Sequence, residues 1–125
     1  MQRQIVRTPD APSSPAYSQA VKAAGLVFVS GTGPYDSATG QVTGDTIQAQ
    51  TRQCLSNIEA ILEAAGSSLQ QIVSATVILR DEDDFGGMNE EWLRWFPVDP
   101  PARQGAKLPV RIAGLRVSVA VIAQA

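Results

Sequence analysis

Histidine is absent from this 125-residue chain, and cysteine occurs once, as Cys54. The lack of imidazole excludes zinc sites built from histidine and cysteine. It also excludes Ser-His-Asp and Cys-His nucleophile systems, because each needs a base that the chain does not have. Metal binding would have to rely on carboxylates alone. A single cysteine cannot form an internal disulfide, which agrees with a reducing compartment.

Long apolar runs are also lacking, since no segment approaches the roughly 20 apolar residues needed to cross a bilayer. The start, Met1-Gln2-Arg3-Gln4-Ile5, has no apolar stretch behind a basic residue, so we expect no secretory signal and a cytoplasmic location. The net charge of −2 and the pI near 5.0 disfavour a broad phosphate-binding face. We therefore expect no membrane and no nucleic-acid partner, and one domain over residues 1–125.

Hydrophobic periodicity predicts two helices among five strands. The clearest element is the helix 44–65, whose apolar residues recur at helical spacing. Asp45 or Thr46 can cap its start, and Gly66 suits the left-handed turn after its end. In chain order the predicted elements are strands 4–7 and 26–30, helix 44–65, strand 72–80, a helix from Asp83 or Asp84 that ends before Pro97, and strands 102–108 and 115–123.

The order β-β-α-β-α-β-β predicts an α+β fold in which both helices cover one face of a sheet. The other face would be small and semi-apolar where a solvated face would carry Lys and Glu. Such a face predicts self-association, because symmetric homo-oligomers usually cover it. Its expected residues are Ser74, Thr76, Ile78, Ser118, Ala120 and Ile122.

Several motifs favour structural roles. Gly31-Thr32-Gly33 follows a strand, but Pro34 leads into a turn and not into a helix N-terminus, so a phosphate loop is disfavoured. The acidic run 81–84 is more typical of a solvated helix cap than of a cation site. Cys54 lies on the apolar stripe of the first helix, which predicts a core position. Trp92 and Trp95 cannot both point straight into the core, so one of them can line a cleft or an interface, although simple packing is the favoured interpretation.

Arg103 is the strongest candidate for binding. Pro100-Pro101-Ala102 delivers it rigidly to the start of a strand. There its guanidinium could hold a carboxylate through two parallel hydrogen bonds. Composition alone does not separate this role from that of a surface arginine.

Five segments in order resemble the RidA family, also called YjgF/YER057c/UK114. Pro-Ala-Arg followed by an alternating final strand is the most specific of them, and together the segments cover nearly the whole chain. They are Ala-Tyr-Ser-Gln-Ala at 16–20, residues 26–31, Ile-Leu-Glu-Ala-Ala-Gly at 61–66, the 84–89 stretch, and Pro-Ala-Arg at 101–103.

The resemblance implies a chorismate-mutase-like fold with an antiparallel or mixed sheet, assembled as a homotrimer with clefts between subunits. It implies cofactor-free hydrolysis of reactive 2-imino acids and enamines to 2-oxo acids and ammonia, with no metal. Carried over by position, Arg103 would bind the substrate carboxylate, and Tyr17, the second expected catalytic residue, would line the cleft and orient the imine. Ser30 and Asn89 would line the cleft and orient the imine, and Gly31 and Gly105 would offer backbone groups.

The chain departs from the family pattern at two positions. The deaminating branch carries a glutamate before the residues that match Val121-Ile122-Ala123, and this chain has Ala120 there. Gly105 replaces a common cysteine and widens the pocket. The alternative function is therefore a non-catalytic trimer that binds small carboxylates. RNA cleavage, attached to relatives as endoribonuclease L-PSP, is disfavoured because no basic track or histidine pair is present.

Overall fold

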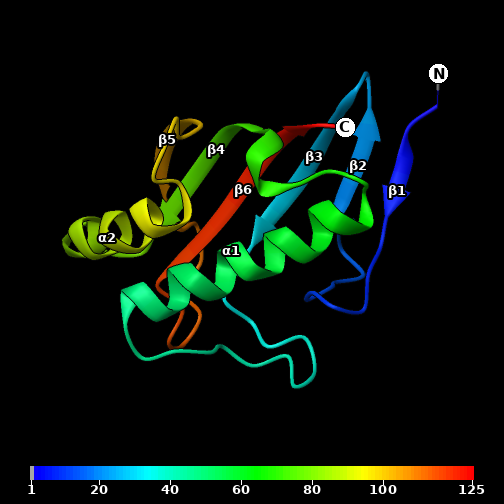
Figure 1. The fold of residues 1–125 in the computed structure, drawn as a ribbon. Coiled ribbons are helices and arrows are strands. Elements are labelled where there is room, and N and C mark those ends of the chain that lie inside the picture. The colour runs from blue at the N-terminus through cyan, green and yellow to red at the C-terminus, as the bar shows by residue number, and fades with distance from the viewer. Residues whose placement is uncertain (1) are drawn as a thin grey trace.

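The computed structural model describes residues 2–125, and Met1 lies outside the described part. One mixed sheet of six strands forms a layer, with the strands in the order β1-β2-β3-β6-β4-β5 (Figure 1). The predicted α+β class is confirmed. The strands are β1 (Gln4–Val6), β2 (Ala20–Ala23), β3 (Leu26–Thr32), β4 (Ile72–Leu79), β5 (Ala102–Lys107) and β6 (Val117–Gln124).

Strand β2 is the element that the sequence pattern missed. It pairs antiparallel with β3, from Ala20 opposite Val29 to Ala23 opposite Leu26. The two-residue connection, Ala24-Gly25, has positive φ at both positions, 55° and 76°. Positive φ at both central residues is the geometry of a tight hairpin turn, but alanine is an uncommon first residue there. The observed order is therefore β-β-β-α-β-α-β-β.

Helix α1 (Ile47–Ala64) corresponds to the predicted helix 44–65 but begins three residues later and ends one residue earlier, and Thr46, one of the two predicted candidates, is its cap. The Thr46 hydroxyl accepts the Ala49 backbone N–H at 3.1 Å, which satisfies one of the free donors of the first turn. Gly66 follows the helix with φ of 79°. The apolar stripe, including Cys54, is fully buried against the sheet, and burial raises the pKa of the Cys54 thiol strongly, so it stays protonated.

Helix α2 (Phe85–Trp95) follows a short 3₁₀ turn (Glu82–Asp84), in which the Asp81 carboxylate accepts the Asp83 N–H at 2.9 Å. The acidic run thus caps a helical turn, as predicted, and Asp84 also pairs with Arg116 at 3.3 Å. Both helices lie on the same side of the sheet (Figure 1). The connection through α2 lets β5 pair with β4 in parallel, while β6 pairs antiparallel with both β3 and β4.

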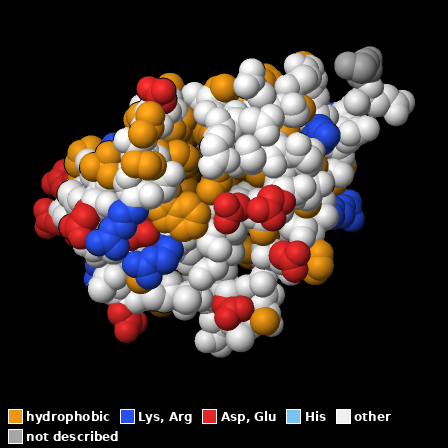
Figure 2. Space-filling view, viewed as in Figure 1, with side chains coloured by type: hydrophobic (Ala, Val, Ile, Leu, Met, Phe, Trp, Pro, Cys, Tyr) orange, Lys and Arg blue, Asp and Glu red, His pale blue; other side chains and the backbone are white. Residues whose placement is uncertain are grey.

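A buried carboxylate joins the two helices. The Glu91 side chain is 3% exposed, and it accepts the Trp95 indole N–H at 2.9 Å and the Arg52 Nε at 3.3 Å. Arg94 lies 3.7 Å away on the same helix. Burial alone would raise the pKa of Glu91, but the hydrogen bonds from Trp95 and Arg52 lower it below the usual range. Figure 2 shows basic and acidic side chains side by side where α2 meets the start of α1.

Among residues 2–125, no helix covers the opposite face of the sheet. Its side chains on β4 and β6 are half-buried, and Phe28 of β3 is 41% exposed. The register places Ser74 opposite Ile122, Thr76 opposite Ala120 and Ile78 opposite Ser118, so the predicted small and semi-apolar residues do share one face. Within residues 2–125, no helix has the length and apolar character needed to cross a membrane.

Candidate functional site

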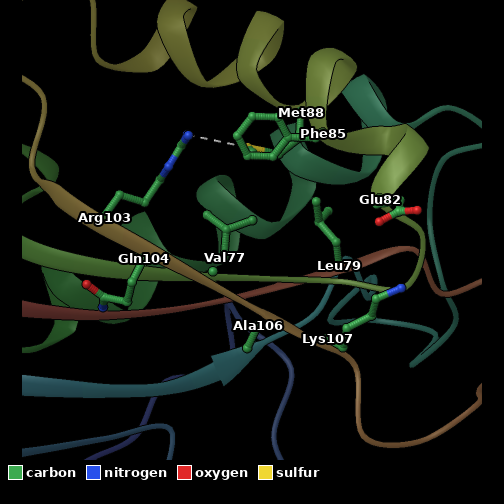
Figure 3. Close-up of a pocket in the computed structure, with 10 residues that line it drawn as sticks. Val77, Leu79, Glu82, Phe85, Met88, Arg103, Gln104, Ala106 and Lys107 are labelled. Atoms are coloured by element: carbon green, nitrogen blue, oxygen red, sulfur yellow. Dashed lines mark hydrogen bonds between the residues drawn. The ribbon is translucent and has the colours of Figure 1, made fainter.

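Arg103 lines a cavity between the β4–β5 edge and α2, which we call the Arg103 cavity. Its volume is about 590 Å³, and its wall residues include Val77, Leu79, Glu82, Phe85, Met88 and Gly105. Val77 and Leu79 point into it from β4, Phe85 and Met88 from α2 (Figure 3). Gln104 and Ala106 point to the other side of β5, because side chains alternate along a strand (Figure 3).

The Arg103 guanidinium is held by soft and aromatic groups. Its Nη1 donates to the Met88 Sδ, a weak acceptor, at 3.6 Å. Its Cζ lies 5.2 Å from the centroid of the Trp92 ring and 5.7 Å from the centroid of the Phe85 ring. Burial lowers the pKa of the Arg103 guanidinium, although an arginine remains protonated at neutral pH. Within residues 2–125 it forms no ion pair. A half-buried cation of this kind is suited to an external anion.

Tyr17 lines a second cavity, the Tyr17 cavity, of about 480 Å³ at the end of the uncovered face. It also contains Ser30, Gly31, Tyr35, Ile78 and Ser118. Side-chain hydrogen bonds to the backbone shape this region: the buried side-chain amide of Asn57, on α1, donates to the Gly33 carbonyl at 3.0 Å and to the Tyr35 carbonyl at 2.9 Å. Burial and then the nearby Tyr17 raise the pKa of Tyr35 above its usual value. Tyr17 itself is 54% exposed.

Ser30 has a structural partner in this region. Its hydroxyl donates to the Ser18 carbonyl at 2.6 Å, and its backbone N–H donates to the Gln19 carbonyl at 3.0 Å. The buried Gln19 amide group in turn donates to the Thr8, Ala11 and Pro12 carbonyls at 2.9 to 3.0 Å. Ser30 therefore fixes the segment that carries Tyr17, and its hydroxyl can offer a ligand only its remaining lone pairs.

Ala120 lies on the uncovered face of β6, opposite Thr76 of β4. On its other side the β3–β6 pairing is irregular between Val29 and Thr32, where Ser30 and Gly31 lie. A longer side chain at position 120 would therefore start beside the Tyr17 cavity. No Asp or Glu lines that cavity among the described residues. The carboxylate absent at 120 has no substitute within this cavity of a single chain.

The predicted site residues fall into two groups. Arg103 and Gly105 line the Arg103 cavity, while Tyr17, Ser30 and Gly31 line the Tyr17 cavity. Asn89 is half-buried on α2, next to Met88, and lines neither cavity. A single chain thus separates the two groups, and their roles stay a prediction.

The sequence interpretation did not name Phe85, Met88 or Trp92 as site residues. Of the two tryptophans, Trp92 is buried in the core with its ring near the guanidinium, whereas the partly buried Trp95 donates to Glu91 and lines a small cavity beside Pro97. The helical spacing of residues 85, 88 and 92 was the sequence signal that could have found them, because these residues share one face of α2. The Gly31-Thr32-Gly33 segment ends β3 and leads into the turn between Tyr35 and Val42, not into a helix. Within residues 2–125, no group of three potential metal-ligating side chains occurs.

Comparison with known proteins agrees with this architecture. The family model described as Endoribonuclease L-PSP matches residues 8–125. The RutC family protein PH0854 of Pyrococcus horikoshii is 44% identical over 102 residues, which cover 81% of each chain. The crystal structure of YyfA from Yersinia pestis, described as a protein of unknown function of the conserved Rid family, superposes with a TM-score of 0.92. It is 31% identical and covers 99% of this chain and 100% of its own.

The chain therefore belongs to the RidA (YjgF) family, as its motifs predicted. One relative in this family carries the name Reactive Intermediate Deaminase A. It is the chloroplastic protein of Arabidopsis thaliana, 38% identical over 114 residues that cover 88% of this chain and 61% of that protein. Because that relative is chloroplastic, a cytoplasmic location of the present chain stays a prediction.

Proposed function

We propose that this chain forms a homotrimer that hydrolyses 2-imino acids and their enamine tautomers to 2-oxo acids and ammonia. In this proposal Arg103 binds the substrate carboxylate at a cleft between two subunits. The observation that carries it is the half-buried Arg103 guanidinium, which lies against Met88, Phe85 and Trp92 without a carboxylate partner among residues 2–125. A substrate carboxylate would supply the missing charge and use its free N–H donors.

The assembly is supported by the separation of the two groups of site residues. Arg103 projects to the helix side of the sheet, and Ser30 and Gly31 lie at the uncovered side. Side chains on opposite sides of one sheet cannot meet around a small ligand. A neighbouring copy is therefore needed to bring a Tyr17 cavity to the Arg103 cavity. Self-association through the small, semi-apolar face would supply that neighbour, and three such contacts close a ring.

The reaction itself requires few groups. A water molecule adds to C2 of the imine while the nitrogen takes a proton, which gives a carbinolamine. The C–N bond then breaks as the hydroxyl proton moves to the nitrogen, so that the 2-oxo acid and ammonia leave. In the proposed trimer Arg103 would fix the acid end, and the Tyr17 hydroxyl of a neighbouring copy would exchange a proton with the nitrogen or the water. No metal or cofactor takes part in the proposed reaction.

The decisive experiment generates 2-iminopropanoate in situ and follows the release of ammonia and pyruvate in the presence of the purified protein. We expect acceleration over buffer that is lost in Arg103→Ala. Size-exclusion chromatography with light scattering should give three times the 13.3 kDa chain mass. A rate equal to that of buffer, or a monomeric protein, would contradict the proposal.

A non-catalytic trimer that binds small carboxylates is the second candidate, and Ala120 is the observation that favours it. Without a carboxylate in the Tyr17 cavity, no side chain there is an evident base for the attacking water. This alternative predicts saturable binding of 2-oxo acids that Arg103→Ala abolishes, with no turnover of any imine. The same purified protein and the same variant therefore separate the two functions.

Endoribonuclease activity, which the name of the family model suggests, is a weaker candidate. Metal-free RNA cleavage needs paired acid and base groups and a basic track for the backbone. The chain has no histidine and a net charge of −2. A nuclease assay with Arg103→Ala as a matched preparation would show whether any cleavage belongs to the protein, because a contaminating nuclease would be the same in both samples.

A further inference from the structure

Gly105 lies on the same side of β5 as Arg103, opposite Val77 in the parallel pair with β4. Its φ is not in the left-handed region. A Cβ at this position would meet nothing closer than the Val77 carbonyl oxygen at 3.5 Å, which is ordinary van der Waals contact. The backbone therefore does not require a glycine here. The effect of the glycine is to leave the floor of the Arg103 cavity without a side chain.

The space that this glycine leaves open is mainly apolar. Beyond the guanidinium, Val77 and Leu79 form one wall and Phe85 forms the other (Figure 3). At the far end Glu82 and Lys107 bring opposite charges to the same rim, so neither sign dominates. The volume of about 590 Å³ lies within the range of roughly 300 to 1,000 Å³ that accommodates drug-sized ligands, and a three-carbon acid would fill little of it.

We propose that the Arg103 cavity selects 2-imino acids, and their 2-oxo acid products, with bulky apolar side chains of the branched-chain or aromatic type. This inference rests on the proposed function of Arg103. The carboxylate would pair with the guanidinium, and the side chain would lie over Gly105 between Val77, Leu79 and Phe85. Each methylene buried there contributes roughly a factor of four in affinity, so a leucine-like or phenylalanine-like side chain gains an order of magnitude or more over a methyl group.

Dicarboxylic acids are the main competing class, since Lys107 lies two residues beyond Gly105 on the same side of β5. The Glu82 carboxylate on the same rim would repel a second ligand carboxylate, and both side chains are exposed to water. Exposed charge pairs contribute little. The apolar wall, which occupies most of the space between the two ends, therefore decides the preference.

The test is isothermal titration calorimetry of the trimer with pyruvate, 4-methyl-2-oxopentanoate, phenylpyruvate and 2-oxoglutarate. We expect the branched-chain and aromatic acids to bind at least about tenfold more tightly than pyruvate. Gly105→Val should remove that preference, because the added side chain fills the space over residue 105 and weakens the binding of the branched-chain and aromatic acids more than that of pyruvate. Ala102→Val, on the same strand but pointing to the other side, is the matched control and should keep the preference.

The outcomes separate this inference from the function beneath it. Size-independent binding that Arg103→Ala abolishes would overturn the selectivity alone, as would tightest binding of 2-oxoglutarate. Failure of every 2-oxo acid to bind the unmodified trimer would overturn the carboxylate role of Arg103 and the selectivity with it. A preference that persists unchanged in Gly105→Val would overturn the placement of the ligand side chain over Gly105.

Discussion

The Arg103 cavity and the Tyr17 cavity are built by different kinds of interaction. In the Arg103 cavity, side chains hold the functional group: two rings and a thioether surround the guanidinium. In the Tyr17 cavity, hydrogen bonds to backbone carbonyls from Asn57, Gln19 and Ser30 hold the chain, and Tyr17 extends from it with half of its surface exposed. The Arg103 cavity therefore holds a positive charge among packed side chains, whereas the shape of the Tyr17 cavity is set by its backbone.

This difference separates binding from turnover. In the proposed function, the Arg103 cavity supplies the positive charge that binds the substrate carboxylate. The Tyr17 cavity contains hydroxyl groups but no carboxylate to activate water, because residue 120 is alanine. Substitutions in the first region should therefore change affinity for every ligand, whereas substitutions in the second should change the rate of the chemical step.

The largest effect is expected for Arg103→Ala. Loss of two charge-assisted hydrogen bonds should reduce kcat/KM, or 2-oxo acid affinity, by about 100-fold or more. Steady-state kinetics and calorimetry measure both quantities. Arg3→Ala, which removes an exposed arginine that lines neither cavity, is the control and should leave both quantities unchanged. Equal affinities in Arg103→Ala and the unmodified protein would remove the basis for distinguishing the two regions.

Ala120→Glu should have the next largest effect, in the opposite direction. A carboxylate beside Ser30 and Gly31 restores a general base, and such groups accelerate reactions by roughly 10²- to 10⁴-fold when they are well positioned. We expect kcat for imine hydrolysis to rise at least about tenfold with little change in KM. Ala120→Gln has the same shape without the charge and should not reproduce the gain. If both variants act alike, the missing carboxylate is not what limits turnover.

Ser30→Ala tests whether Ser30 positions Tyr17. Loss of the hydrogen bond to the Ser18 carbonyl should weaken the positioning of Tyr17 by about 1 kcal/mol, which corresponds to a kcat about fivefold lower. KM should stay constant, because the Arg103 cavity is untouched. Ser30→Thr keeps the hydroxyl and should restore kcat. A rise in KM without a change in kcat would assign Ser30 to direct substrate binding.

The smallest effect concerns Glu91, which supports the helix behind the Arg103 cavity. Because its pKa is lower in the folded protein, its ionised form stabilises the fold above the usual glutamate pKa of about 4.3. That contribution is lost as the pH falls through the folded pKa. In urea unfolding, the free energy of unfolding of Glu91→Gln should therefore be about 1 kcal/mol lower than that of the unmodified protein near neutral pH. This difference should shrink on acidification. A deficit that grows toward low pH would contradict this assignment.

The elements with strong periodicity were predictable from the sequence. Helix α1 could be delimited because the Thr46 cap, the apolar stripe and Gly66 agree with one another, and β6 could be recognised by its strict alternation. Strand β2 could not, because Ala20–Ala23 is short and weakly patterned, and it is extended only through its pairing with β3. Its turn, Ala24-Gly25, also lacks the asparagine or aspartate that marks such a hairpin.

The sequence indicated most of the predicted site residues that line a cavity, but Asn89 lines neither cavity, and the functional roles of all of them stay predictions. Arg103, Gly105, Tyr17, Ser30 and Gly31 all line cavities, which motif resemblance could anticipate. The rings around Arg103 come from a helix that is adjacent only in three dimensions. Likewise, the bond from Ser30 to the Ser18 carbonyl depends on the register of β2 and β3, which the sequence pattern did not reveal.

The parallel pairing of β4 with β5 has a consequence for how the protein can diverge. All wall residues of the Arg103 cavity come from one uninterrupted stretch, β4, α2 and β5, between residues 72 and 107. Apart from Ile78 of β4, the residues that line the Tyr17 cavity come from the chain before and after that stretch. Mutations can therefore accumulate around the Tyr17 cavity while the Arg103 cavity is inherited as one continuous segment. A descendant of this fold can then lose, regain or exchange its chemistry and keep the proposed carboxylate-binding site.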